Sequence, residues 1–231
     1  MVESRADWKP DHLNALPEQA IAIQSTLQQR VVTHNLLGVV KAVAGVDVGF
    51  PTKDIARAAV VVLSFPELAP IHCAVAETPV EFPYIPGLLA FREMPAVLAA
   101  VEKLKARADL FIFDAHGLAH PRRLGLACHA GLILDRPSIG CAKSRLTGDY
   151  VEPGTERGDW SPLRDGDECI GAVLRTRAGV RPVFVSIGHR IDLETAISFV
   201  LACAPKYRLP ETTRLAHRAA SGQAIELNRP A

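Results

Sequence analysis

Residues 109–114 read Asp-Leu-Phe-Ile-Phe-Asp, four apolar residues between two carboxylates. A short, almost wholly apolar run of this kind predicts a strand buried on both faces, as in a parallel sheet covered by helices. Asp114 then stands at the carboxyl end of the strand, the edge at which open α/β sheets bind their ligands. This stretch therefore predicts a fold class and the place of a site together.

The chain on both sides of this strand completes an α/β pattern. Strands are expected at 43–50, 58–65 and 71–77, and their short links favour an antiparallel meander. After the meander, apolar strands alternate with helices, which is typical of parallel strands. The other expected elements are helices at 94–105, 124–134, 193–203 and 212–220, strands at 138–142, 169–176 and 182–187, the last two as a hairpin, and a long loop at 149–168.

A first helix is expected to begin near Pro17, because proline suits the first turn of a helix. Its apolar face is predicted to consist of Ile21, Ala22, Leu27, Val31 and Val32. With no internal repeat and no long linker, we predict one α/β domain over residues 1–231. Its central mixed sheet combines the meander with parallel strands and is flanked by helices, with short flexible tails at about 1–12 and 221–231.

Composition excludes several classes of protein. The 231 residues are 48% hydrophobic and 22% charged, which argues against disordered and fibrous chains. The net charge of +1 gives no global positive field, although a local basic patch is compatible with it. The five cysteines contain no Cys-x-x-Cys pair, so neither a disulfide framework nor a paired zinc site is expected. The first residues lack the apolar core of a signal peptide, and no apolar run reaches the ~20 residues of a membrane span. We expect a cytoplasmic protein without membrane contact.

Three carboxylates occupy positions where a charge is costly. Asp47 sits inside an apolar strand, Asp114 ends one, and Glu93 stands just ahead of Pro95 at an expected helix start. Acids that meet at one sheet edge repel each other unless cations join them, and an all-oxygen site suits Mg²⁺ or Mn²⁺. Each also has an ordinary explanation: a water-facing strand end for Asp47, turn chemistry for Asp114 and a helix-dipole contact for Glu93.

The residues after Asp114 add cations. Residues 114–123 read Asp-Ala-His-Gly-Leu-Ala-His-Pro-Arg-Arg. Beside a carboxylate metal site, Arg122 and Arg123 would suit phosphate binding, and otherwise they form a solvated turn. Lys143 ends another strand and could neutralise a phosphate oxygen, or simply lie at the surface, as could His217 in its short helix.

Residues 82–87, Phe-Pro-Tyr-Ile-Pro-Gly, form a stiff segment in which two prolines bracket Tyr84 and Ile85. Such a segment can be an ordinary packed loop. It can also be a rigid wedge that inserts between bases, with Gly87 allowing close approach of the backbone to a flipped base.

Together these segments resemble the endonuclease V family of deoxyinosine 3′-endonucleases, which have a ribonuclease H-like fold. The resemblance covers about residues 16–220. Its carriers are Gly-Val-Asp-Val at 45–48, Pro-Tyr-Ile-Pro-Gly-Leu-Leu-Ala-Phe-Arg-Glu at 83–93, the segment 114–123, Gly-Cys-Ala-Lys-Ser at 140–144 and Arg-Leu-Ala-His at 214–217.

The resemblance implies roles for individual residues. Tyr84 would be the tip of a wedge that also contains Pro83, Ile85 and Pro86, and Gly87 and Leu89 would line a hypoxanthine pocket. Lys143 would be a catalytic cation near the scissile phosphate, and His120 would lie close to the metal-bound phosphate. The implied ligands of Mg²⁺, for which Mn²⁺ can substitute, are Asp47, Glu93, Asp114 and His217.

The implied activity is DNA repair: a metal-dependent nick at the second phosphodiester bond 3′ to deoxyinosine, leaving 3′-hydroxyl and 5′-phosphate ends. Damaged DNA would be the partner, and we expect a monomer. A ribonuclease acting at inosine in RNA and a catalytically silent inosine-binding module are the alternatives. The sequence departs from the family pattern at Ala115, where glycine is usual, and at Gly49, where serine is common. The methyl group of Ala115 bears on the shape of the base pocket.

Overall fold

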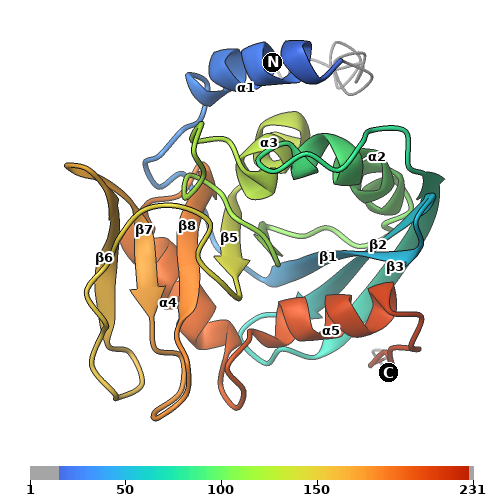
Figure 1. The fold of residues 1–231 in the computed structure, drawn as a ribbon. Helices are drawn as coiled ribbons and strands as arrows, with labels where there is room; N and C mark the ends of the chain where they lie inside the picture. The colour runs from blue at the N-terminus through green and yellow to red at the C-terminus, as the bar shows by residue number, and fades with distance from the viewer. Residues whose placement is uncertain (1–15, 229–231) are drawn as a thin grey trace.

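The computed structural model describes residues 16–228, so the tail predicted at 1–12 lies outside the described residues. One eight-stranded sheet runs through them with helices on both sides (Figure 1). The helices are α1 (Pro17–Gln28), α2 (Leu89–Glu102), α3 (Leu126–Leu134), α4 (Leu193–Cys203) and α5 (Glu211–Ala220). The strands are β1 (Ala42–Thr52), β2 (Ile55–Ser64), β3 (Pro70–Pro79), β4 (Leu110–Phe113), β5 (Ser138–Ala142), β6 (Trp160–Asp165), β7 (Glu168–Leu174) and β8 (Val183–His189).

The sheet order is β3-β2-β1-β4-β5-β8-β7-β6. Strands β1, β2 and β3 pair antiparallel, which confirms the meander, and β1–β4 and β4–β5 pair parallel. Strand β8 returns antiparallel beside β5 and pairs with β7 as the expected hairpin. The predicted mixed sheet is therefore confirmed, and β4 and β5 end side by side in its middle, next to residues in the middle of β1.

Two apolar layers cover the sheet, one on each face. Alternate residues of β1 divide between them: Ala44 and Val46 pack with α2 and α3, whereas Val43 packs with α4 and α5. Figure 1 shows α2 and α3 above the sheet, α4 and α5 below it, and α1 outside α3. The hydrophobic contacts on both faces hold the strand ends in place.

Helix α5 lies unusually close to β1 because glycines line the strand beneath it. A Cβ added at Gly45 would lie 2.0 Å from the carbonyl oxygen of Thr212, and one at Gly49 would lie 3.3 Å from that of Ala220. Asp47 stands between the two glycines on the same face of the strand, because side chains alternate. The glycines therefore let α5 come within side-chain reach of Asp47.

The first helix forms as predicted, and Leu27 of its predicted apolar face is buried, but the rest of that face is wrong. Ile21 is 45% exposed, and Val31 and Val32 lie beyond the helix end at Gln28. Ala20 and Gln24 are buried beside Leu27 in their place. Hydrogen bonds from the Gln24 amide to buried carbonyls allow a polar side chain to face inward there.

Two other boundaries differ from the prediction. Helix α2 begins at Leu89 and contains Pro95, because burial of Ala90, Phe91 and Met94 extends it upstream of the proline. Glu93 is therefore inside the helix, not ahead of it. The loop predicted at 149–168 contains β6, which tolerates Pro162 because β6 is the last strand of the sheet and pairs with one strand, β7, apart from a single bridge between Asp149 and Arg164.

Residues beyond α5 pack along the apolar layer that α4 and α5 form on one face of the sheet. Ile225 packs against that core, and the Asn228 amide donates to the carbonyl of Pro70 at 2.8 Å. Within residues 16–228, no helix combines the length and the apolar character that a membrane crossing needs.

We predict that Gly45→Ala destabilises the protein by about 1–3 kcal/mol, because the new methyl group overlaps the Thr212 backbone and pushes α5 from β1. Urea unfolding measures the loss. Gly38→Ala is the control, since an added Cβ there meets nothing within 4 Å, and it should stay within ~0.5 kcal/mol of the parent. Equal stabilities of the two variants would contradict the packing argument.

Candidate active site

Parallel pairing of β1 and β4 brings two aspartates together. Val46 is in register with Phe113, and the Asp114 amide continues the ladder to the Val46 carbonyl at 3.0 Å. Asp47 follows Val46 and Asp114 follows Phe113, so the two aspartates lie side by side. Their side chains are 12% and 6% exposed. Ligand atoms of these two residues and of His217 all lie within 4.8 Å of one another. At the carboxyl end of β4 the fold thus brings together two of the three carboxylates that the sequence singles out, with His217 beside them.

A nitrogen-bearing side chain contacts each of the two aspartates. His217 of α5 contacts Asp47 through Nδ1 and Oδ2 at 2.7 Å, and the Lys143 ammonium, just after β5, pairs with the Asp114 carboxylate. Burial and the neighbouring charge of Asp114 raise the pKa of Asp47, whereas His217 and Lys143 oppose that rise. The effects that raise the pKa of Asp47 therefore outweigh the contacts with His217 and Lys143.

Glu93 reaches the same place from α2, on the other face of the sheet. It is 7% exposed and lines a pocket together with Asp114. Burial, followed by the charges of Asp47 and Asp114, raises the pKa of Glu93 to about 8. Without a cation, this carboxyl is neutral at physiological pH.

The donor set fits a hard divalent cation. Carboxylate oxygens dominate it, with one imidazole, and no thiol is among the clustered residues. Burial, followed by the neighbouring carboxylates, raises the pKa of both Asp47 and Glu93 and so disfavours their charged forms. A bound divalent cation would favour those charged forms. Asp47, Asp114 and His217 would hold the ion, and Glu93 lies close enough for its pKa to respond to both aspartates.

A pocket of about 370 Å³ opens beside the acid cluster. It is walled by residues 84–87 and the start of α2 on one side, and by residues 114–116 and 142–146 on the other. Ala115, the departure from the family pattern, is part of the wall. The predicted site residues in the lining are Tyr84, Ile85, Pro86, Gly87, Leu89, Glu93, Asp114, His120 and Lys143.

The segment 83–87, hereafter the wedge loop, ends in a tight turn. The Leu88 amide donates to the Ile85 carbonyl at 2.9 Å, Pro86 holds the second position, and Gly87 has φ +79°. These are the features of a type II turn, which requires a positive φ at its third residue. Tyr84 projects from the loop with 70% of its surface exposed, whereas Pro83 lies outside the pocket lining.

His120 is held by two hydrogen bonds. Its Nδ1 accepts from the Arg122 amide at 3.1 Å, so Nε2 carries the proton and donates to the Gly87 carbonyl at 2.9 Å. Burial, with the nearby Arg122 charge, lowers the pKa of His120 to about 4. The ring is therefore neutral and supports the wedge loop, and both of its nitrogens are occupied.

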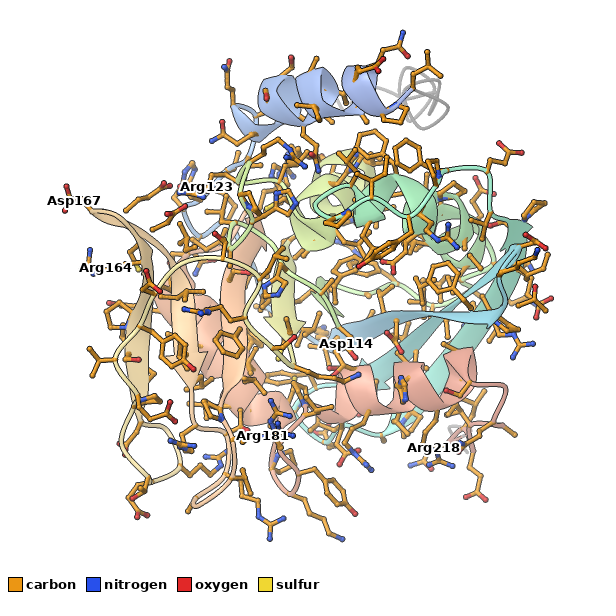
Figure 2. All side chains as sticks on the ribbon, viewed as in Figure 1. Asp114, Arg123, Arg164, Asp167, Arg181 and Arg218 are labelled. Atoms are coloured by element: carbon orange, nitrogen blue, oxygen red, sulfur yellow. The ribbon has the colours of Figure 1, made fainter. Side chains whose placement is uncertain are left out.

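The two adjacent arginines separate. Arg122 donates to the Gly87 carbonyl at 2.7 Å. It thereby holds a residue of the pocket wall without lining the pocket itself. Arg123 turns away with φ 54° and pairs with Asp165 and Glu168 at 2.9 and 2.7 Å. Figure 2 shows it far from Asp114, toward the β6–β8 end of the sheet. These salt bridges fix the β6–β7 hairpin and leave Arg123 outside the pocket.

Several pocket residues escape prediction from sequence. Gln24, His116, Arg145 and Leu146 all line the cavity. Gln24 carried a detectable signal, because it stands in helical phase with the buried Ala20 and Leu27. Burial lowers the pKa of His116 to about 4, so this ring is neutral as well.

Comparison with known proteins assigns the family. A family model described as Endonuclease V matches residues 25–218. The chain belongs to the endonuclease V family. Endonuclease V of Roseiflexus sp. strain RS-1 is 57% identical over 203 residues, 88% of this chain and 91% of that protein.

Solved structures of endonuclease V agree with this assignment. The crystal structure from Streptomyces avermitilis has a TM-score of 0.87 at 44% identity and covers 94% of both chains. A Ciona intestinalis endonuclease V was solved with a 24-mer DNA containing an inosine followed by a ribo-adenosine. It has a TM-score of 0.75 at 27% identity, over 87% of this chain and 94% of that one. The expected ribonuclease H-like fold is confirmed.

We predict that Mg²⁺ or Mn²⁺ raises the melting temperature, because an ion that binds only the native state stabilises it by about 2.7 kcal/mol at a hundred times its Kd. Asp114→Asn should abolish the rise. Asp167→Asn, on the β6–β7 turn (labelled in Figure 2), is the control and should keep it. Thermal unfolding with and without the metal measures both, and equal shifts in the two variants would exclude the cluster as the metal site.

A second prediction concerns pH in the metal-free protein. Between pH 4.5 and about 8 the unfolded chain ionises Glu93 while the native chain keeps it protonated, so stability falls as pH rises. Glu93→Gln removes this loss. Its stability relative to wild type should rise across that range by more than about 1 kcal/mol. Urea titrations at several pH values test this, with the exposed Glu102→Gln of the same helix as control; parallel curves for wild type and Glu93→Gln would contradict it.

Proposed function

We propose that this protein is a DNA repair endonuclease that recognises deoxyinosine and hydrolyses the second phosphodiester bond on its 3′ side. The products would be a 3′-hydroxyl and a 5′-phosphate. The observation that carries the proposal is the meeting of two features at one place. The acid cluster of Asp47, Asp114 and His217 adjoins a pocket headed by the wedge loop.

The metal residues would be Asp47, Asp114 and His217, with Glu93 beside them. A bound Mg²⁺, or Mn²⁺ in its place, supplies a Lewis acid and charge neutralisation at the phosphate. Lys143, whose side chain is 41% exposed beside Asp114, can approach a phosphate from solvent. Its ammonium would stabilise negative charge as the bond breaks.

Recognition would depend on extrusion of the base. Tyr84 at the exposed tip of the wedge loop would fill the space that the base leaves, and Pro83 and Pro86 keep the loop stiff. The pocket volume of about 370 Å³ suits a small ligand. Hypoxanthine pairs weakly, so its extrusion costs less than that of a normal base, which favours the lesion. His120 and Arg122 would hold the pocket wall at Gly87, whereas Arg123 would act only through the β6–β7 hairpin.

A ribonuclease acting at inosine is the second candidate. The Ciona intestinalis relative binds a strand in which a ribo-adenosine follows the inosine, so a ribose at that position is compatible with this fold. A silent inosine-binding module is disfavoured, because a pure binder has no need for clustered acids with raised pKa values. We further propose a monomer in the reducing cytoplasm, in keeping with five free cysteines.

An end-labelled duplex with one deoxyinosine tests the reaction. With Mg²⁺ we expect a single nick one nucleotide beyond the lesion, and with EDTA none. The same sequence as an RNA strand with inosine separates the two substrates. Cleavage of RNA alone would replace the DNA proposal, and binding without any cleavage would favour the silent module.

Asp114→Ala should abolish cleavage and retain binding of the deoxyinosine duplex, because Asp114 belongs to the acid cluster while the rest of the pocket stays intact. The loss should reach at least about a hundredfold. Gel-shift titration and the nicking assay measure the two properties, with Asp167→Ala as control. Cleavage by Asp114→Ala at the wild-type rate would reject the metal assignment.

A further inference from the structure

The Gly87 carbonyl is the meeting point of three side chains. It accepts from Gln24 Nε2 at 3.0 Å, from His120 Nε2 at 2.9 Å and from Arg122 Nη2 at 2.7 Å. We call these three side chains the Gly87 clamp. Two of the donors come from the segment that follows Asp114, but Gln24 comes from α1, 63 residues before Gly87.

Gln24 joins the parts of the clamp. Its Oε1 accepts from Arg122 Nε at 2.5 Å, and its Nε2 also reaches the Leu124 carbonyl at 3.2 Å. The residue is 0% exposed, so no water can replace these bonds at its surface. A buried amide with every bond in place holds its partners in one arrangement.

The turn at Gly87 needs such support. The backbone angle φ of +79° favours glycine at this position, and an added Cβ would lie 2.7 Å from Arg122 Nη2, so the guanidinium would have to move away from the Gly87 carbonyl. Glycine, however, is the residue that fixes its own peptide least. The orientation of the Gly87 peptide, which forms a wall of the pocket, therefore depends on the side chains that hold its oxygen.

We infer that Gln24 is a positioning residue for base recognition, which holds the Gly87 wall of the pocket in the shape that accepts the extruded base. This inference rests on the proposed function. Helix α1 would then be part of the recognition apparatus, although it lies outside α3 and away from the sheet (Figure 1). A supporting residue of this kind acts on affinity for the lesion and leaves the reacting phosphate untouched.

Two variants of Gln24 test the inference. Gln24→Leu keeps the approximate volume and removes every polar contact. Gln24→Glu keeps the Arg122 contact as an ion pair but cannot donate to Gly87, so it remains informative if the leucine variant fails to fold. Leu27→Ala is the matched control, because Leu27 is buried on the same helix face against Leu124, Cys128 and Leu132 and does not contact the clamp.

The first readout needs no substrate. Hydrogen–deuterium exchange of a peptide spanning residues 82–92 should become at least about tenfold faster in both Gln24 variants. Leu27→Ala should lower the melting temperature without this change. Unchanged exchange in a folded Gln24 variant, or an equal change in Leu27→Ala, would overturn the inference.

The second readout is kinetic. For the deoxyinosine duplex we expect KM to rise about tenfold or more in the Gln24 variants, with kcat changed less than about threefold. Affinity for undamaged duplex should stay constant, because the clamp acts on the Gly87 wall of the pocket, which would be filled only when a base is extruded. A fall in kcat with constant KM, or an equal loss of affinity for undamaged DNA, would contradict a role in base recognition. If wild type itself fails to cut deoxyinosine, the proposed function fails, and the exchange measurement still decides whether Gln24 holds the loop.

Discussion

Mutual repulsion between Asp47 and Asp114 is the constraint on which the rest of the site depends. The parallel register of β1 and β4 leaves these carboxylates no freedom to separate, and both are largely buried. Their charge has to be compensated from other elements. His217 arrives from α5 and Lys143 from the end of β5, while Glu93 escapes the repulsion by remaining protonated. The two close carboxylates thus account for the kinds of side chain that surround them.

Small residues make the compensation possible. Gly45 and Gly49 remove the side chains that would keep α5 away from β1, and Ala216, Ala219 and Ala220 form the buried surface of the helix. A helix packed at the usual distance would leave His217 short of Asp47. The same segment of β1 therefore supplies Asp47 and, through Gly45 and Gly49 on the same face, the room for its partner His217.

Much of this arrangement could be predicted from the sequence, because apolar strands that carry a carboxylate are unusual. Asp47 and Asp114 stand out for that reason, and the carboxyl end of a parallel strand is where an α/β sheet is expected to bind its ligands. The sequence places Glu93 ahead of its helix, because Pro95 favours a helix that begins next to it. The helix begins earlier, at Leu89, because Phe91 and Met94 are buried against parts of the chain that a local sequence pattern does not show. Arg122 and Arg123 are adjacent and of the same type, so the sequence gives no reason to treat them differently. Asp165 and Glu168, more than forty residues away, bind Arg123 and hold it away from the pocket. Gln24 was missed because its partners are far along the chain.

The residues that form the site are far apart in the sequence, and this separation determines when the site can assemble during synthesis and folding. Asp47 and His217 are 170 residues apart, and Gln24 and Leu124 are 100 apart. Chains emerge from the ribosome from the N-terminus onward, and pairings between distant segments form late in folding. The acid cluster cannot be completed until α5 has been synthesised and has docked on β1. A nascent or partly folded chain therefore lacks the assembled cluster, and the capacity to damage nucleic acid appears only with the finished fold.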